Sequence, residues 1–174
     1  MKLSRKDFKA EAQTYLKAAN PSVVKWVGKE INKAIVGGKT FEELGYTIDN
    51  VDQVVTSPSI LNEFELRRTE LESKGHGLES ANKKLQTVNA YLCPEDDKMD
   101  QIVTDGFFKT YEGARIAFPQ DPVQAIREGF SQSRKLLICR VVLGQHELLN
   151  NKYIVKNSKG CMASFIVYFS SGGD

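Results

Sequence analysis

The sequence has few of the residues that most often bind metals or carry out nucleophilic chemistry. Its 174 residues include three cysteines and two histidines. Cys93, Cys139 and Cys161 are odd in number and widely spaced. This spacing indicates neither a disulfide framework nor a zinc motif, so reduced thiols are expected, as in nuclear or cytosolic proteins. We therefore predict no metal site.

Long hydrophobic runs and an excess of one charge are also missing. No run approaches 18 apolar residues, so no membrane span is expected. The start of the chain, MKLSRKDFKAEAQ, lacks the apolar core of a secretory signal. With 24 basic and 22 acidic side chains, the net charge of +2 gives no reason to expect nucleic acid or an acidic membrane as partner. The glycines form no phosphate-binding loop.

Three groups of polar residues could suggest catalysis or metal binding, and each is assigned a structural role. His76 stands between two glycines, which is typical of a solvated loop. His146 and Glu147 follow a strand, where neighbours point to opposite faces and cannot act as one acid–base pair. A cluster of acidic residues lies at a predicted helix start, where the helix dipole already favours carboxylates: Asp96, Asp97 and Asp100.

The last forty residues are the most informative. They contain three β-branched or aromatic runs bounded by Gly, Asn or Ser, and each run is typical of a strand: LLICRVVLG from 136 to 144, KYIVK from 152 to 156 and SFIVYF from 164 to 169. The first run is apolar nearly throughout, as in a strand buried on both faces. We therefore predict four core residues: Leu137, Cys139, Val141 and Val155.

The rest of the chain alternates helical and strand patterns. Apolar periodicity and helix caps predict helices over 4–19, 23–36, 60–74, 98–105 and 122–128. Strands are predicted over 48–56 and 85–93, with a short one before 118. The apolar stripes of the first two helices are expected to pack on the protein's own sheet, and the alternative is that they cover another protein. The charged helix over 60–74 is a candidate contact surface.

The order and the residue sequences of the final strands resemble those of the poly(ADP-ribose) polymerase (PARP) catalytic domain. Within that family, the run Asn89–Pro94 and the helix ending in Asp105-Gly106-Phe107 resemble the plant SRO proteins ("similar to radical-induced cell death"). The pseudo-PARP domain of the chromatin-silencing protein TASOR is a second, weaker likeness. The resemblance implies an α+β fold of two packed sheets with flanking helices, preceded by a helical N-terminal extension.

The same resemblance divides the chain into three parts. Residues 1–46 form a helical N-terminal segment, residues 47–170 form the PARP-like domain, and residues 171–174 are a linker-like tail. Active members of the family carry a His that binds the nicotinamide amide and the ribose. They also carry a Tyr that stacks on the ring and a Glu that stabilises the transition state. By alignment, these positions fall on Leu92, Arg115 and Lys152, so all three roles are lost.

These replacements imply a domain with no catalytic residues and no cofactor, NAD included. The expected function is a catalytically inactive PARP-like domain used for protein interaction or scaffolding. By resemblance it belongs to a nuclear protein that regulates transcription, the stress response or chromatin silencing, and its partners are nuclear proteins. Two alternatives stay open: a mono-ADP-ribosyltransferase with a non-standard site, and a module that binds NAD or ADP-ribose without turnover.

Overall fold

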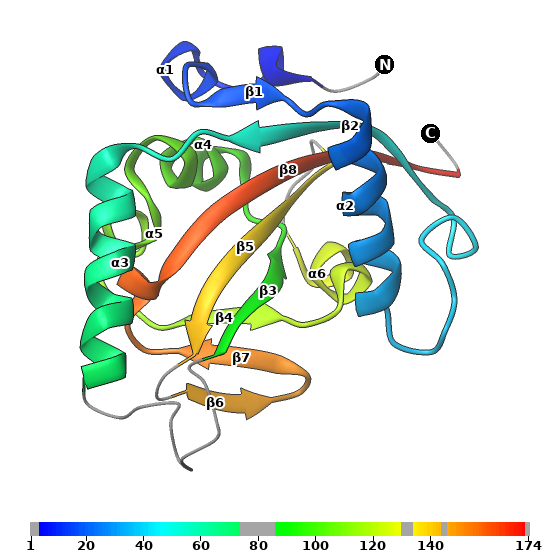
Figure 1. The fold of residues 1–174 in the computed structure, drawn as a ribbon. Helices are drawn as coiled ribbons and strands as arrows, with labels where there is room; N and C mark the ends of the chain where they lie inside the picture. Colours follow the sequence, from blue (N-terminus) through cyan, green and yellow to red (C-terminus); the bar gives the residue numbers. More distant parts are fainter. Residues whose placement is uncertain (1–3, 74–85, 130–133, 144–145, 173–174) are drawn as a thin grey trace.

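Two antiparallel sheets form the centre of the computed structural model, which describes residues 4–73, 86–129, 134–143 and 146–172 (Figure 1). The larger sheet has the strand order β1-β2-β8-β5-β3: Leu16–Ala18, Tyr46–Val54, Cys161–Ser171, Lys135–Leu143 and Gln86–Leu92. The smaller sheet has the order β4-β7-β6: Ile116–Pro119, Lys152–Val155 and His146–Leu149. The α+β class predicted from the sequence, with two sheets, is confirmed.

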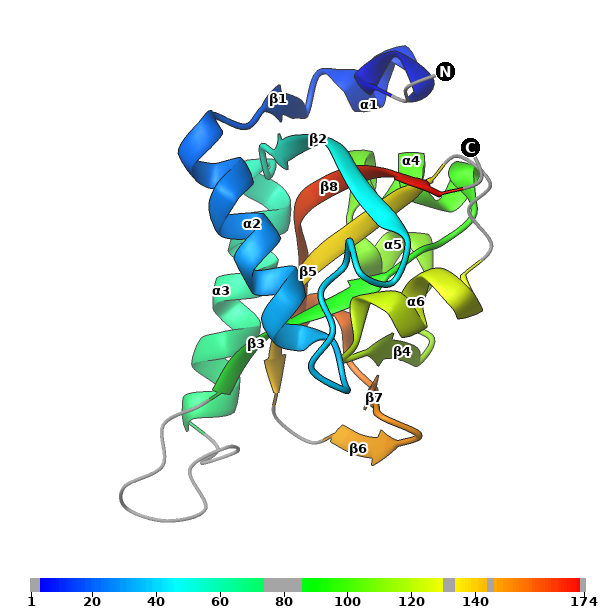
Figure 2. The ribbon, with the colours of Figure 1, turned by 90° about the vertical axis from the view of Figure 1, so that its right-hand side faces the viewer.

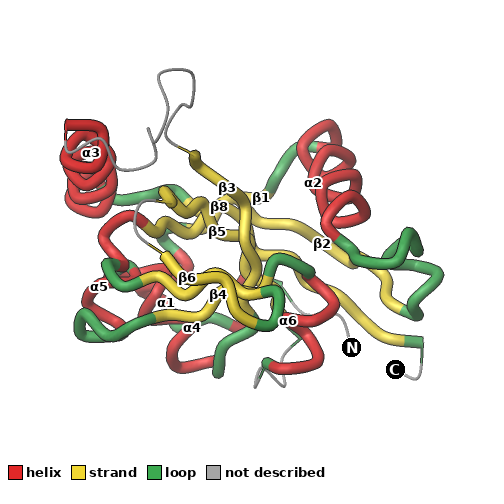
Figure 3. The backbone as a smooth tube through the Cα atoms, turned by 90° about the horizontal axis from the view of Figure 1, so that it is seen from below, coloured by secondary structure: helices red, strands yellow, loops and turns green. Residues whose placement is uncertain are grey.

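Helices cover both faces of the larger sheet. Viewed from below, α2 (Pro21–Ala34) and α3 (Pro58–Ser73) lie on one side of it (Figure 3). On the other side lie α1 (Ala10–Gln13), α4 (Asp96–Asp105), α5 (Phe107–Thr110) and the smaller sheet. The helix α6 (Pro122–Glu128) lies beside β3 and β4 (Figure 2). The described residues also include short 3₁₀ turns at Arg5–Asp7 and Ser158–Gly160.

The strand β5 lies between β3 and β8 and is buried at every position except Arg140, as its nearly continuous apolar run predicts. Leu137, Cys139 and Val141 are fully buried, and Val155 on β7 is buried in the same core. The three cysteines have free thiols. The predicted core residues are therefore confirmed.

Shortening Val141 tests this core. The side chain is fully buried, so Val141→Ala removes two methyl groups from contact with β3, β8 and the smaller sheet. We expect the free energy of unfolding to fall by about 1–3 kcal/mol, from lost burial and the cavity that remains. Urea unfolding measures the change. Val55→Ala is the matched control, because Val55 is 49% exposed and its truncation should leave the midpoint unchanged. Equal midpoints for both variants would show that β5 is not central.

The prediction of one helix over 4–19 is wrong. The α-helix covers only Ala10–Gln13, and Leu16–Ala18 pairs with β2 as an edge strand. The chain is extended at Phe8, whose ring packs edge-on against Tyr168 in the core. An isolated short helix is marginally stable, so the free edge of β2 and the burial of Phe8 outweigh local helix propensity.

The N-terminal segment is also held by charged groups. The Arg5 Nε lies 3.5 Å from Oδ1 of the fully buried Asp52, and Asp52 Oδ2 accepts a 2.7 Å hydrogen bond from the Tyr168 hydroxyl. The buried Lys135 Nζ lies 4.4 Å from the centre of the Phe8 ring. The boundary at residue 46 stays a prediction. In the structure, residues on both sides of it share one sheet and one core.

The second predicted helix packs on the protein's own sheet, as expected. Asn20 caps α2 by accepting a hydrogen bond from the Val23 amide. Val27 and Ile31 are fully buried and join Leu136, Ile138 and other residues of the sheet in one cluster. Val24 and Ala34 flank this stripe and are half-buried.

The polar groups singled out in the sequence have structural partners. Asp97 lies 3.6 Å from Lys9 Nζ, and Asp100 accepts a 2.8 Å hydrogen bond from the Lys9 amide. Asp96 Oδ1 lies 3.6 Å from Lys135 Nζ. His146 and Glu147 are exposed on β6, a strand that the sequence did not predict. His76 lies outside the described residues.

Within the described ranges, no helix has the length and apolarity that crossing a membrane requires. The described residues also contain no group of three or more His, Cys, Asp or Glu side chains that could hold a metal ion.

Candidate functional site

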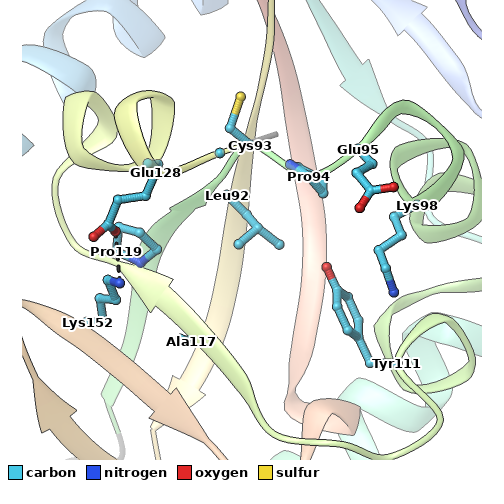
Figure 4. Close-up of a pocket in the computed structure, with 12 residues that line it drawn as sticks. Leu92, Cys93, Pro94, Glu95, Lys98, Tyr111, Ala117, Pro119, Glu128 and Lys152 are labelled. Atoms are coloured by element: carbon cyan, nitrogen blue, oxygen red, sulfur yellow. Dashed lines mark ion pairs between the residues drawn. The ribbon is translucent and has the colours of Figure 1, made fainter. Parts of the chain in front are cut away.

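A cavity of about 290 Å³ lies between the end of β3, the start of α4, strand β4 and the end of α6 (Figure 4). Its walls are largely apolar, with charged side chains at two ends. The lining residues are Leu92, Cys93, Pro94, Glu95, Lys98, Tyr111, Ala117, Pro119, Ala125, Glu128, Gly129 and Lys152.

The first wall is built where β3 stops. Leu92 is the last residue of β3, and Pro94 follows two positions later, where the strand cannot continue. Cys93 is buried, and its thiol donates a 3.2 Å hydrogen bond to the Lys135 carbonyl oxygen on β5. The Cys93 thiol therefore supports the wall rather than facing a ligand as a reactive group.

The second wall depends on a close approach between α6 and the end of β3. Gly129 follows α6, and a Cβ placed on it would lie 2.4 Å from both the Cβ and the carbonyl oxygen of Cys93. It would also lie 2.8 Å from the Ala125 carbonyl oxygen. The φ of Gly129 is −77°, so the need for glycine here is one of space and not of a left-handed conformation. The missing side chain lets α6 close the cavity.

One end of the cavity carries a paired lysine. Lys152 opens β7, where it pairs with Pro119 of β4. Its Nζ lies 2.9 Å from Glu128 Oε2, and Figure 4 shows this ion pair across one side of the cavity. The lysine side chain is 25% exposed, so the pair is partly desolvated. The charge of Lys152 is therefore compensated within the protein.

The opposite end carries Tyr111 and Lys98. Tyr111 lies just after α5, and its ring stacks on Phe107 at a centroid distance of 6.3 Å. The Lys98 Nζ lies 4.6 Å from the centre of the Tyr111 ring, within the range of a cation–π interaction. Burial raises the pKa of Tyr111 to about 12, with smaller contributions from Cys139 and Glu95. Tyr111 is therefore a neutral hydrogen-bond donor at physiological pH.

The structure brings together two of the three positions aligned with the family's catalytic residues. Leu92 and Lys152 line the same cavity. Arg115 is exposed in the turn before β4 and does not line it. The aromatic residue that does line the cavity is Tyr111, four positions earlier, which the sequence analysis did not single out.

Sequence reasoning also missed Glu95, Lys98 and Glu128. Glu95 and Lys98 follow Leu92 closely, across the break at Pro94, so their presence near the site could have been inferred from that spacing. Nothing local in the sequence brings Glu128 to Lys152, since this pair depends on how α6 and β7 pack.

Comparison with known proteins identifies the fold but no family. No protein-family model matches the sequence, and no curated protein matches it significantly. The crystal structure of the TASOR pseudo-PARP domain does match, with a TM-score of 0.70 at 9% sequence identity. The match covers 90% of this chain and 99% of that one. The chain therefore has a PARP-like fold similar to that of a pseudo-PARP domain. The comparisons give no support to the likeness to the SRO proteins.

Proposed function

We propose that this chain is a catalytically inactive PARP-like domain that serves as a protein-interaction or scaffolding module in a nuclear regulatory protein. The observation that carries the proposal is Lys152. It lies in the cavity, aligned with the carboxylate that active PARPs use, and it is held there by Glu128.

The cavity has no free carboxylate at the position where active PARPs use one to cleave NAD. The nicotinamide ring of oxidised NAD is cationic, and positive charge develops on the ribose as the glycosidic bond breaks. A carboxylate at this position stabilises the transition state, whereas Lys152 supplies no negative charge and takes up that of Glu128 in an ion pair. Leu92, aligned with the family's histidine, has no side-chain group that can hydrogen-bond the nicotinamide amide.

The size of the cavity also argues against NAD as its ligand. Ligand pockets commonly measure about 300–1,000 Å³. A cavity of about 290 Å³ lies at the lower limit and is suited to one ring-sized group rather than a dinucleotide.

Exposed apolar side chains support a role in protein contacts. Leu66 on α3 is 69% exposed, and Leu148 and Leu149 on the edge strand β6 are each about 60% exposed. Trp26 on α2 is also exposed and contacts Phe165. Apolar groups of this size are common at contact surfaces. The nuclear setting, and a role in transcription, stress response or chromatin silencing, rest on the sequence resemblances described above.

Incubation with labelled NAD tests the loss of activity. We expect no transfer of ADP-ribose to the domain itself or to nuclear-extract proteins, because the carboxylate and histidine positions are Lys152 and Leu92. An active PARP domain in the same buffer is the positive control. Labelled product would establish the alternative of a non-standard mono-ADP-ribosyltransferase. Binding of NAD without product would establish the second alternative, a module that binds the cofactor without turnover.

Replacement of Leu66 tests the interaction role. We expect Leu66→Lys to reduce recovery of the partners that the wild-type domain captures from nuclear extract at least about fivefold, a change of roughly 1 kcal/mol in binding. Val36→Lys is the matched control, since both side chains are 69% exposed and lie on different elements. Quantitative mass spectrometry compares the three pull-downs. Equal recovery by both variants would remove α3 from the contact surface, and recovery of nothing above background by the wild-type domain would contradict the interaction role.

A further inference from the structure

The two lysines that line the cavity differ in their partners. Lys152 has its carboxylate, Glu128, at 2.9 Å. Lys98 is half-buried, and in the part of the chain that the structure describes its ammonium contacts the Tyr111 ring but forms no ion pair. An ammonium that is partly removed from water gains from an anionic partner.

We propose that the cavity binds an apolar, ring-sized group that carries one carboxylate, with the carboxylate on Lys98 and Tyr111. The inference rests on the proposed function in one respect, which is that NAD does not occupy this site. It goes further in assigning the site a ligand of defined chemistry.

The walls and volume select the apolar part of this ligand. Leu92, Pro94, Ala117, Pro119 and Ala125 present carbon atoms to the cavity. At about 290 Å³ the space accommodates one ring with its substituents. Burying that ring on these side chains supplies the non-directional part of the affinity.

Lys98 and Tyr111 select the acidic part. The Lys98 ammonium has three donors, and the ring of Tyr111 fixes its position at the cavity end (Figure 4). The neutral Tyr111 hydroxyl is a further donor in the same region. Glu95 lines this end as well, and its carboxylate contributes to the raised pKa of Tyr111, but its side chain is exposed, so water weakens its repulsion of a bound acid.

A small set of matched probes tests the charge preference. Benzoate and N-acetyl-phenylalanine each combine a ring with a carboxylate, while benzamide and N-acetyl-phenylalaninamide are their neutral counterparts. We expect dissociation constants on the order of 1 mM for an acid of this size. Binding is followed by ¹H–¹⁵N correlation spectra of the wild-type domain, with shifts expected at Leu92, Lys98 and Tyr111. Each amide should bind at least about tenfold more weakly than its acid.

Variants of Lys98 locate the acid. We expect Lys98→Gln to weaken benzoate binding to the level of benzamide and Lys98→Arg to retain it, since the cation is kept. Lys109→Gln is the control, because Lys109 is an exposed lysine of α5 that does not line the cavity. None of these changes removes a buried apolar group, so unchanged spectra away from the cavity will show that each variant is folded.

The two acids also distinguish the source of the ligand. Binding of benzoate alone indicates a free aromatic acid, and binding of N-acetyl-phenylalanine indicates the C-terminal residue of a partner chain. Both results support the proposed chemistry. Equal or tighter binding of the amides, or no shift with either acid at about 20 mM, would overturn it. These outcomes are independent of the NAD-transfer assay, so the ligand proposal can fail while the inactive domain stands.

Discussion

Raising the pH above about 10 is expected to unfold the domain, because several groups are buried in their protonated forms. Burial raises the pKa of the Cys139 and Cys161 thiols, and Cys139 is shifted well above its ordinary value. Burial also raises the pKa of Tyr91 and of Tyr168, and the hydrogen bond from Tyr168 to Asp52 adds to the second shift. The pKa of Tyr111 rises to about 12 for the same main reason.

Proton linkage explains why stability falls, rather than rises, as the pH increases. In the unfolded chain a thiol loses its proton near pH 8.5 and a tyrosine near pH 10, both approximately, while the folded protein still holds these protons. The folded state therefore binds more protons, and stability falls as pH rises. Each such group lowers the free energy of unfolding by about 1.4 kcal/mol per pH unit, so the four most buried groups together give about 5 kcal/mol per unit above pH 10. A domain of ordinary stability, about 5–15 kcal/mol, should lose its fold within a few pH units.

Urea unfolding followed by circular dichroism from about pH 8 to about pH 11 measures this fall. Tyr91→Phe is the matched control, because it removes one titrating proton and leaves the Tyr168–Asp52 hydrogen bond in place. The free energy of unfolding of Tyr91→Phe should fall with pH less steeply than that of the wild type, and the two slopes should differ by about 1.4 kcal/mol per pH unit. An unfolding midpoint that stays constant over this range would show that the tyrosines and thiols are accessible to solvent.

Substituting Gly129 is expected to cause the other large effect. The added Cβ of Gly129→Ala meets backbone and Cβ atoms of Cys93 at 2.4 Å, and these atoms cannot move aside as a flexible side chain could. The end of α6 must shift away from β3, which opens the wall of the cavity. We expect the free energy of unfolding to fall by about 3 kcal/mol. Thermal and urea unfolding measure the loss.

Gly28 provides a control, because its substitution by alanine is expected to stabilise the domain. Gly28 lies inside α2, and an added Cβ would meet Ile48 at 3.9 Å, an ordinary contact. Gly28→Ala should therefore raise the free energy of unfolding by about 0.5–1 kcal/mol, because alanine loses less conformational freedom in a helix. If Gly129→Ala proved as stable as the wild type, α6 would not be held against β3 as described.

The strands predicted correctly are those whose local pattern reports their burial. The strand β5 is apolar at nearly every position because β3 and β8 flank it and other elements cover both of its faces. By contrast, two strands depend on a pairing that their own sequences do not indicate. Leu16–Ala18 pairs with β2, and His146–Leu149 pairs with β7. Apolar spacing in the first segment suits a helix equally well, so the pattern alone could not choose between them.

The candidate site shows the same limit. Leu92 and Lys152 line one cavity because the end of β3 and the start of β7 meet there, and their alignment with the catalytic residues of active PARPs stays a prediction. Arg115, aligned through a short and degenerate motif, is exposed and does not line the cavity, whereas Tyr111 does. The contact between Lys98 and Tyr111 joins α4 to the end of α5, and only the packing of those helices brings the two side chains together.

Calorimetric titration with NAD tests the central claim most directly, which is that the cavity has lost its cofactor. The wild-type domain is titrated with millimolar NAD, and its melting temperature is compared with and without the cofactor. We predict no saturable heat and no rise in melting temperature, because a ligand stabilises the fold only by binding it. A saturable heat with a matching rise in melting temperature, abolished by a substitution at Leu92 or Lys152, would contradict the account.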